Sequence, residues 1–125
     1  MKSPDGKREV VKSAFYEIRM GSPLFGAVAV FGGLAATSRR TFGEAMSFDA
    51  TSRFLAIEEF LGTKNNVPHT RTVVFDLETG AEALVHHQNP GFIKKFVWES
   101  DGSLTLFAWS HLSGEVVRRS AWKDR

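Results

Sequence analysis

The sequence predicts an all-β protein, an antiparallel meander or sandwich of hairpins with at most one short helix. Short segments of alternating apolar and polar residues recur along the chain, and turn residues separate them. The 125 residues include 11 Phe and 3 Trp, and aromatic residues are enriched in strands. No stretch has the spacing of a long amphipathic helix. The length suggests one domain that covers residues 1–125.

Two strands are predicted in the first third of the chain. Glu9–Met20 alternates between apolar and polar residues after a turn signal at residues 3–7. Leu24–Phe31 is apolar throughout, which predicts a strand buried on both faces, although a short buried helix has the same signature. The following segment, residues 32–44, fits a loop and one or two helical turns about equally well.

The middle of the chain predicts two more strands and a hairpin. The strands are Ala45–Phe48 and Arg53–Leu61, and the second carries apolar side chains on both faces, as a central strand does. In the hairpin, Arg71–Val85, two alternating segments flank a turn at residues 78–80. Gly80 supplies the positive φ that a short hairpin loop often needs.

Three strands are predicted after residue 91. Phe92–Trp98 and Ser103–Trp109 flank an Asp-Gly turn, and this dipeptide between alternating segments is a strong hairpin signal. Glu115–Trp122 is the last predicted strand. Its adjacent arginines, at positions 118 and 119, place charge on both faces, which is typical of an edge strand that avoids pairing with other chains.

An aromatic residue, an acidic turn and a strand occur at Phe48–Ile57 and again, 50 residues later, at Trp98–Phe107. This period resembles that of β-propeller blades. The blade-like repeats cover approximately residues 46–97 and 98–125, with a fainter one at 3–45. A propeller closes with typically four or more blades. The resemblance therefore implies either a sandwich that stands alone or completion by another copy in a homodimer.

In size and strand pattern the chain also resembles the small bacterial immunity proteins that neutralise toxins delivered between competing cells. This resemblance implies a non-catalytic domain that binds a cognate protein toxin directly. The alternative is a small carbohydrate- or nucleic-acid-binding β module. A pocket lined by Trp98 and Trp109 would favour that alternative.

The expected partner-binding residues lie on and beside two polar loops, at residues 62–70 and 86–91. Both loops flank the same end of the central hairpin, and function tends to collect on loops that a rigid sheet holds. Acidic side chains there would meet a basic toxin surface by charge complementarity. The candidate partner-binding residues are Glu58, Glu59, Asn65, Asn66, His69, Asp76, His86, His87 and Asn89.

The sequence predicts no enzymatic activity, no cofactor and no metal. The absence of cysteine excludes disulfides, cysteine catalysis and thiolate metal sites. On a strand, His86 and His87 would point to opposite faces, and no HExxH spacing occurs. Glu58 and Glu59 would also diverge, which favours a charged strand end over a catalytic pair. Neither a GxSxG elbow nor a glycine-rich phosphate cradle appears.

Charge and hydropathy indicate a cytoplasmic protein that does not bind membranes. The 16 basic and 14 acidic residues nearly balance, so we do not expect nucleic-acid binding, although aromatic residues lie near the basic pairs at 39–40 and 94–95. The first residues lack the apolar run of a secretory signal. The longest apolar stretch, Leu24–Ala36, is too short to cross a bilayer.

Overall fold

The all-β prediction is confirmed. The structure is a computed structural model that describes residues 1–17, 23–65, 67–86, 91–110 and 114–123. Within these ranges the structure contains nine strands. No helix in the described ranges is long and apolar enough to cross a membrane. The strands are β1 Glu9–Glu17, β2 Leu24–Phe31, β3 Thr41–Phe48, β4 Phe54–Lys64, β5 Val67–Asp76, β6 Glu82–His86, β7 Gly91–Trp98, β8 Ser103–Ser110 and β9 Val116–Lys123.

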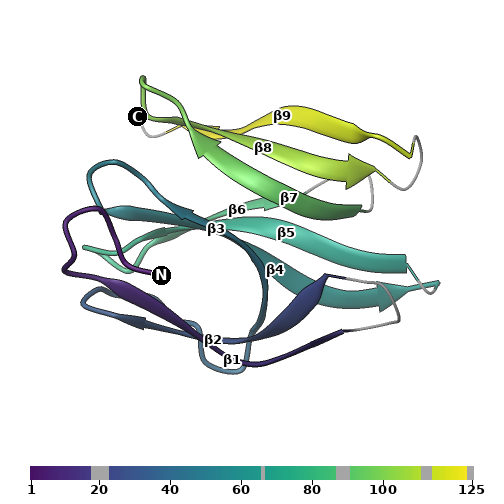
Figure 1. Ribbon diagram of the computed structural model, residues 1–125, viewed down its shortest axis with the longest axis horizontal. Coiled ribbons are helices and arrows are strands. Elements are labelled where there is room, and N and C mark those ends of the chain that lie inside the picture. The colour runs from purple at the N-terminus through teal and green to yellow at the C-terminus, as the bar shows by residue number, and fades with distance from the viewer. Residues whose placement is uncertain (18–22, 66, 87–90, 111–113, 124–125) are drawn as a thin grey trace.

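The strands form two antiparallel sheets in simple up-and-down order. Strands β1 to β6 make the larger sheet, and β7 to β9 make the smaller one. The larger sheet bends sharply at β3, so that β1 and β2 form a separate layer beneath β3–β6 in Figure 1. The bend falls where β3 changes partners: Phe42 pairs with Gly26 of β2, and the β3–β4 register shifts between Phe42 and Met46. The molecule therefore has three layers.

Two hydrophobic cores fill the spaces between these layers. Adjacent residues of a strand point to opposite faces, so β4 contributes to both cores. The lower core contains Val10, Val28, Phe42, Leu55, Ile57, Val73, Phe75 and Leu77. The upper core, between the two sheets, contains Phe54, Ala56, Val74, Ile93, Phe96, Leu104 and Leu106. This division confirms that the strand predicted at Arg53–Leu61 is central and buried on both faces.

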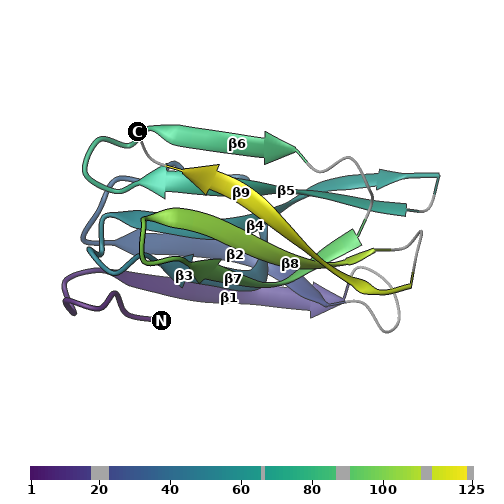
Figure 2. The ribbon, with the colours of Figure 1, turned by 90° about the horizontal axis from the view of Figure 1, so that it is seen from above.

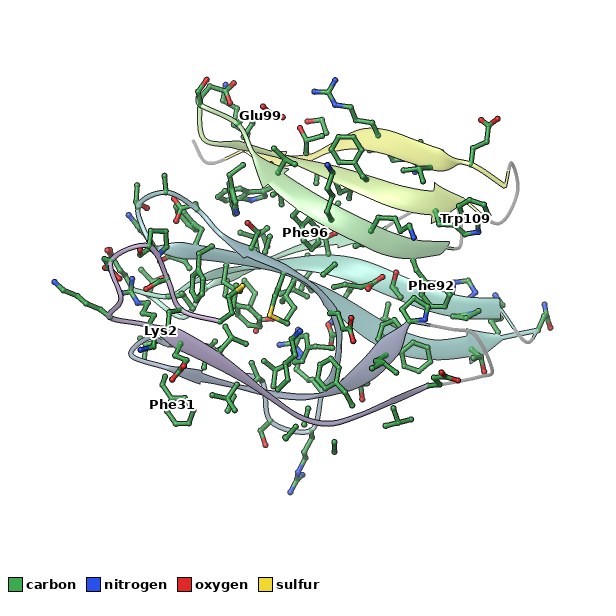
Figure 3. All side chains as sticks on the ribbon, viewed as in Figure 1. Lys2, Phe31, Phe92, Phe96, Glu99 and Trp109 are labelled. Carbon is green, nitrogen blue, oxygen red and sulfur yellow. The ribbon has the colours of Figure 1, made fainter. Side chains whose placement is uncertain are left out.

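The smaller sheet lies over the larger one. Figure 2 shows that β8 and β9 cross the strands beneath them obliquely. Strand β7 lies next to β3 and β5, and Trp122 of β9 packs against Phe54 of β4. Figure 3 shows Phe96 of β7 between the two sheets. Because β9 has a neighbour on one side only, the prediction of an edge strand at the end of the chain is confirmed.

Both predicted hairpin turns are confirmed. Strands β5 and β6 pair from Phe75–Glu82 onward, and Gly80 has a φ of 79° in the turn between them. Strands β7 and β8 pair up to Trp98–Leu104, and Gly102 has a φ of 85°. In both turns, a glycine occupies the left-handed region that other residues adopt at a cost.

Several predicted boundaries are wrong. Residues 62–70 are not a polar loop, because β4 continues to Lys64 and β5 starts at Val67. The third strand begins within the segment that looked like a loop or helix, since β3 starts at Thr41. Strand β2 is not buried on both faces: Ala27, Ala29 and Phe31 alternate toward solvent. The far end of the strand predicted at 9–20 lies outside the described residues.

Candidate functional site

The two adjacent glutamates of β4 point to opposite faces of the larger sheet, as the strand period requires. Glu58 lies on the face covered by the smaller sheet, where its carboxylate accepts a hydrogen bond from the Ile93 backbone N–H at 2.7 Å. Glu59 lies on the face toward the lower layer, opposite Arg71 of β5. The sequence predicts this divergence, but not the burial of both side chains.

Glu58 is a carboxyl group inside the molecule, with only 1% of its surface exposed. Burial raises the pKa of Glu58 to about 8, although hydrogen bonds from Ile93 and Thr70 favour the ionised form. Removing a carboxylate from water disfavours its charge unless an opposite charge compensates. At neutral pH, Glu58 is therefore mainly protonated.

Gly43 of β3 provides the space for this carboxyl group. A Cβ atom added at Gly43 would lie 2.4 Å from Oε1 of Glu58 and 2.9 Å from Cε1 of Phe25. Neither neighbour is free to move away, because Phe25 is fully buried and packs against Phe60 and Phe92 at ring distances of 5.3 and 5.6 Å. Gly43 and Glu58 are thus a matched pair.

We expect Gly43→Ala to lower the free energy of unfolding by about 1–3 kcal/mol, the usual cost of overpacking a buried site. The neighbouring Glu44→Ala is the control, because Glu44 is exposed on the same strand. Urea denaturation of both variants measures the effect. Equal stability of the two would contradict the packing described for Gly43.

Glu59 is the centre of an ion-pair network that spans three strands and the connection before β3. Its oxygens accept hydrogen bonds from Arg40 at 2.8 and 2.9 Å and from Arg71 at 2.7 Å. Arg40 also pairs with Glu82 at 2.7 Å and lies over the rings of Phe42 and Phe75. Burial alone would raise the pKa of Glu59, but the two arginines outweigh it and leave that pKa below its ordinary value.

These contacts correct the prediction that Glu58 and Glu59 form a charged strand end available to a partner. The error follows from the predicted strand length. Strand β4 continues to Lys64, so both glutamates lie in its middle, at 1% and 5% exposure. Neither carboxyl group can contact a partner in this structure.

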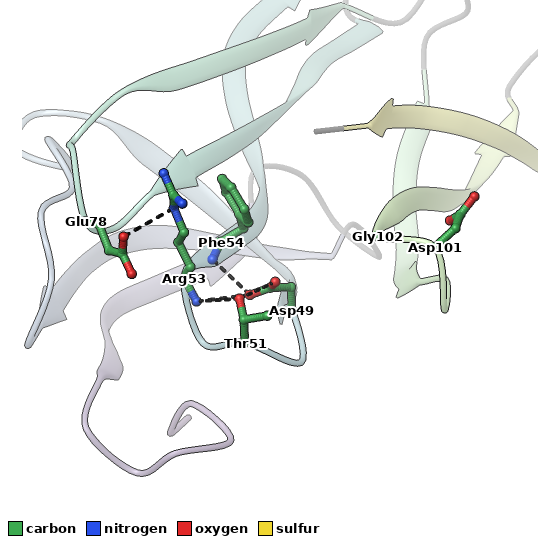
Figure 4. A pocket seen from close by; sticks show the side chains of 7 residues that line it. All are labelled: Asp49, Thr51, Arg53, Phe54, Glu78, Asp101 and Gly102. Atoms are coloured by element: carbon green, nitrogen blue, oxygen red, sulfur yellow. Dashed lines mark hydrogen bonds and ion pairs between the residues drawn. The ribbon is translucent and has the colours of Figure 1, made fainter. Parts of the chain in front are cut away.

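An accessible cleft lies at one end of the molecule, where turns from three hairpins meet (Figure 4). It has a volume of about 490 Å³ and lies between the two sheets. The β3–β4 turn, the β5–β6 turn and the β7–β8 turn each contribute to it. The lining residues are Asp49, Thr51, Arg53, Phe54, Glu78, Asp101 and Gly102.

Acidic groups dominate this turn-end cleft. Arg53 binds Asp76 through two hydrogen bonds, at 2.8 and 3.1 Å, which lower the pKa of Asp76 to about 2. The guanidinium also lies over the Phe54 ring at 5.1 Å and approaches Glu78 at 3.5 Å. Arg53 therefore pairs with two carboxylates, those of Asp76 and Glu78, and the cleft contains further acidic residues.

Two further carboxylates of the cleft stabilise their own turns. Asp49 accepts hydrogen bonds from the backbone N–H groups of Arg53 and Phe54, at 3.0 and 2.9 Å. Asp101 accepts from the backbone N–H and hydroxyl of Ser103, at 2.9 and 2.6 Å. Short acidic side chains that bond to nearby backbone in this way favour turns. Asp101 is exposed and Asp49 is half-buried.

The predicted partner-binding residues do not form one site. Asn65 lies in the exposed β4–β5 turn, and the half-buried His69 pairs with Gly62 within the hairpin. Asp76 lies at the opposite end of β5. His86 belongs to β6, where it pairs with Arg71. The predicted residues Asn66, His87 and Asn89 lie outside the described residues.

Sequence reasoning missed the residues that build the cleft. Arg53 and Asp76 are 23 positions apart and meet because Phe54 pairs with Asp76 across β4 and β5. Asp49 and Asp101 lie in the two turns of the repeated segment, although the shift of 50 residues places Asp49 on Glu99 and Asp101 on Thr51. Their convergence depends on how the smaller sheet docks, which no local pattern reports.

Two other predicted features can be compared with the structure. Trp98 and Trp109 lie near opposite ends of the β7–β8 hairpin, because Trp98 pairs with Leu104 and Trp109 pairs with Phe92, so they do not line a common pocket. Among the residues whose positions are described, no three His, Asp or Glu side chains are grouped so that they could hold a metal ion.

Comparison with protein-family models, with curated proteins and with solved structures finds no match to this chain.

Proposed function

We propose that this chain is a non-catalytic protein-binding domain, an immunity protein of the cytoplasm that neutralises a cognate toxin by direct binding. The proposed contact surface is the turn-end cleft, in place of the loops that the sequence indicated. The observation that carries the proposal is the convergence of acidic turns there. Among the described residues, four carboxylates, Asp49, Asp76, Glu78 and Asp101, lie at this end of the molecule. Arg53 pairs with Asp76 and Glu78, Lys123 lies near Asp101, and Arg8 donates to the Ser52 carbonyl of the β3–β4 turn.

This excess of negative charge suits a partner with a basic surface. The turns belong to both sheets, and each is held by hydrogen bonds within it, such as Gly80 N–H to Asp76 O at 2.7 Å and Gly102 N–H to Glu99 O at 3.0 Å. A partner would therefore meet preorganised charges, which lowers the entropy cost of binding. Complementary charges at such a rim mainly increase the association rate, and salt weakens them.

The test is binding to the product of the neighbouring gene, with Glu78→Lys as the informative variant. Glu78 is more than half exposed and makes one long contact with Arg53, so the substitution should leave the fold intact. We expect about fivefold weaker binding, because a surface ion pair contributes up to about 1 kcal/mol. Calorimetric titration at low and moderate salt measures it.

Glu17→Lys is the matched control, because Glu17 is exposed at the far end of β1. Equal weakening by both substitutions would move the contact away from the turn-end cleft. No binding by the unaltered chain, together with a neighbouring protein that is not toxic when expressed alone, would end the immunity proposal.

One observation favours the alternative of a nucleic-acid-binding module. On the outer face of the smaller sheet, Lys95, Phe107 and Arg118 are cross-strand neighbours. The Lys95 ammonium lies 4.8 Å from the centre of the Phe107 ring. A basic sheet face with an aromatic ring can bind single strands by stacking and phosphate contact. Titration with a single-stranded oligonucleotide distinguishes this alternative from protein binding.

A further inference from the structure

We propose that one proton, held on Glu58, controls the docking of the β7–β9 sheet onto the larger sheet. With the carboxyl group neutral, the two sheets stay packed. When the group ionises, the smaller sheet separates and exposes the apolar face beneath it. The inference does not rest on the proposed partner, but separation of the sheets would also take apart the turn-end cleft, because Asp101 and Gly102 of the smaller sheet line it.

The position of Glu58 carries this inference. The two sheets are separate hydrogen-bonded units, so side-chain contacts hold them together. Most of those contacts are apolar, through residues such as Phe54, Val74, Ile93 and Phe96. The Glu58 side chain adds a direct polar link, since it accepts the backbone N–H of Ile93 in β7 at 2.7 Å and is buried where the sheets meet.

The surroundings of Glu58 leave its charge without compensation. The groups that face it are Gly43 from β3, Thr70 from β5 and the Ile93 N–H from β7. Charged residues on the same elements point elsewhere. Arg71 pairs with Glu59 on the opposite face, and Glu44, Lys94 and Lys95 are exposed. Within the described part of the chain, no cation approaches the buried carboxyl group.

An ionised Glu58 therefore needs water, and water can reach it only if the packing opens. The neutral acid has a lower desolvation cost and keeps an oxygen for the Ile93 N–H. Rotation of the side chain toward β3 is limited, because a Cβ atom at Gly43 would lie 2.4 Å from the Glu58 Oε1 and 2.9 Å from the buried Phe25 ring. The route to solvent that we propose is separation of the smaller sheet.

The direction of the pH effect follows from the two protonation states. The pKa of Glu58 is about 8 when the group is buried, against 4.5 when it is exposed. The docked state therefore binds more protons than the open state between these values, so docking weakens as the pH rises through this interval. The docking constant should fall by up to about tenfold per pH unit and level off above about pH 8.

The test is hydrogen exchange of the full chain, read separately for β7–β9 and for β3–β5, between about pH 5 and about pH 9. Intrinsic exchange rates are corrected for pH at each point. We expect the protection of β7–β9 to fall by up to about tenfold per pH unit, while β3–β5 stays protected. In Glu58→Gln the pH dependence should disappear, because the amide keeps an oxygen for Ile93 and cannot ionise.

Glu44→Gln is the control, because it removes an exposed carboxylate from the adjacent strand. A pH profile in Glu58→Gln that matches the unaltered chain would overturn the proposal. Loss of protection in both sheets together would also overturn it, since the proton would then control global stability. If Glu58→Gln does not fold, carbon-13 NMR of the unaltered chain decides: titration of Glu58 in the ordinary carboxyl range would refute the switch, and titration near the raised value together with selective loss of β7–β9 protection would support it.

Discussion

Replacing Glu59 with alanine is expected to lower the free energy of unfolding by about 3 kcal/mol. Breaking a buried ion pair by removing one partner costs about 3–5 kcal/mol, because the remaining charge stays buried and unpaired. Here two guanidinium groups lose their shared acceptor. The lower end of the range applies, since Arg40 and Arg71 keep 18% and 19% of their side chains exposed.

Urea denaturation of Glu59→Ala and Glu82→Ala measures this effect. Glu82 pairs with the same arginine at 2.7 Å but is more exposed, so its loss should cost less than about 1 kcal/mol. The difference should shrink in acid. Because the pKa of Glu59 is lowered in the folded state, the network contributes stability above the ordinary carboxyl pKa and loses it as the pH falls through the folded pKa. Equal losses of stability in the two variants would mean that water solvates the guanidinium groups of Arg40 and Arg71 once Glu59 is removed.

The second large effect is expected from Phe54→Ala, with a loss of about 3–5 kcal/mol, the usual cost of removing a buried aromatic side chain. Phe54 joins the two sheets. Its ring lies 5.1 Å from that of Trp122 and 6.4 Å from that of Trp98, while the Arg53 guanidinium lies over the ring. Its removal would leave a cavity at the floor of the turn-end cleft, which the paired strands cannot close.

Phe31→Ala is the matched control, because Phe31 is 56% exposed and its removal should change stability by less than about 0.5 kcal/mol. Denaturation followed by tryptophan fluorescence measures both variants and also reports on the environment of Trp98 and Trp122. A small loss in Phe54→Ala would show that the upper core repacks around the missing ring. Binding at the turn-end cleft would then have to be tested again in that variant.

Glu58 and Glu59 respond to pH in opposite directions. The Glu58 contribution weakens as the pH rises, because its pKa is raised, whereas the Glu59 contribution weakens in acid, because its pKa is lowered. Maximal stability is therefore expected between these two transitions. One strand thus holds two carboxyl groups with opposite electrostatic requirements, and the alternating geometry of β4 separates them.

The sequence alone determined the fold class and the hairpins, because these depend on neighbouring residues. Alternating side chains in the β5 and β8 segments and the glycines at 80 and 102 act over a few positions, and the structure agrees with them. The same local signals identified a central strand at β4. The proposed immunity function came from resemblance and remains a proposal.

Only the tertiary structure decided where the acidic residues lie. Glu58 and Glu59 look like surface charges in a sequence. Their burial depends on Gly43 and on three hydrogen-bond donors, Ile93, Arg40 and Arg71, and these donors lie 12 to 35 positions away from the glutamate that each one binds. The turn-end cleft likewise depends on the docking of one sheet on another. Such contacts are set by packing between distant segments, and local periodicity carries no information about which distant segments meet.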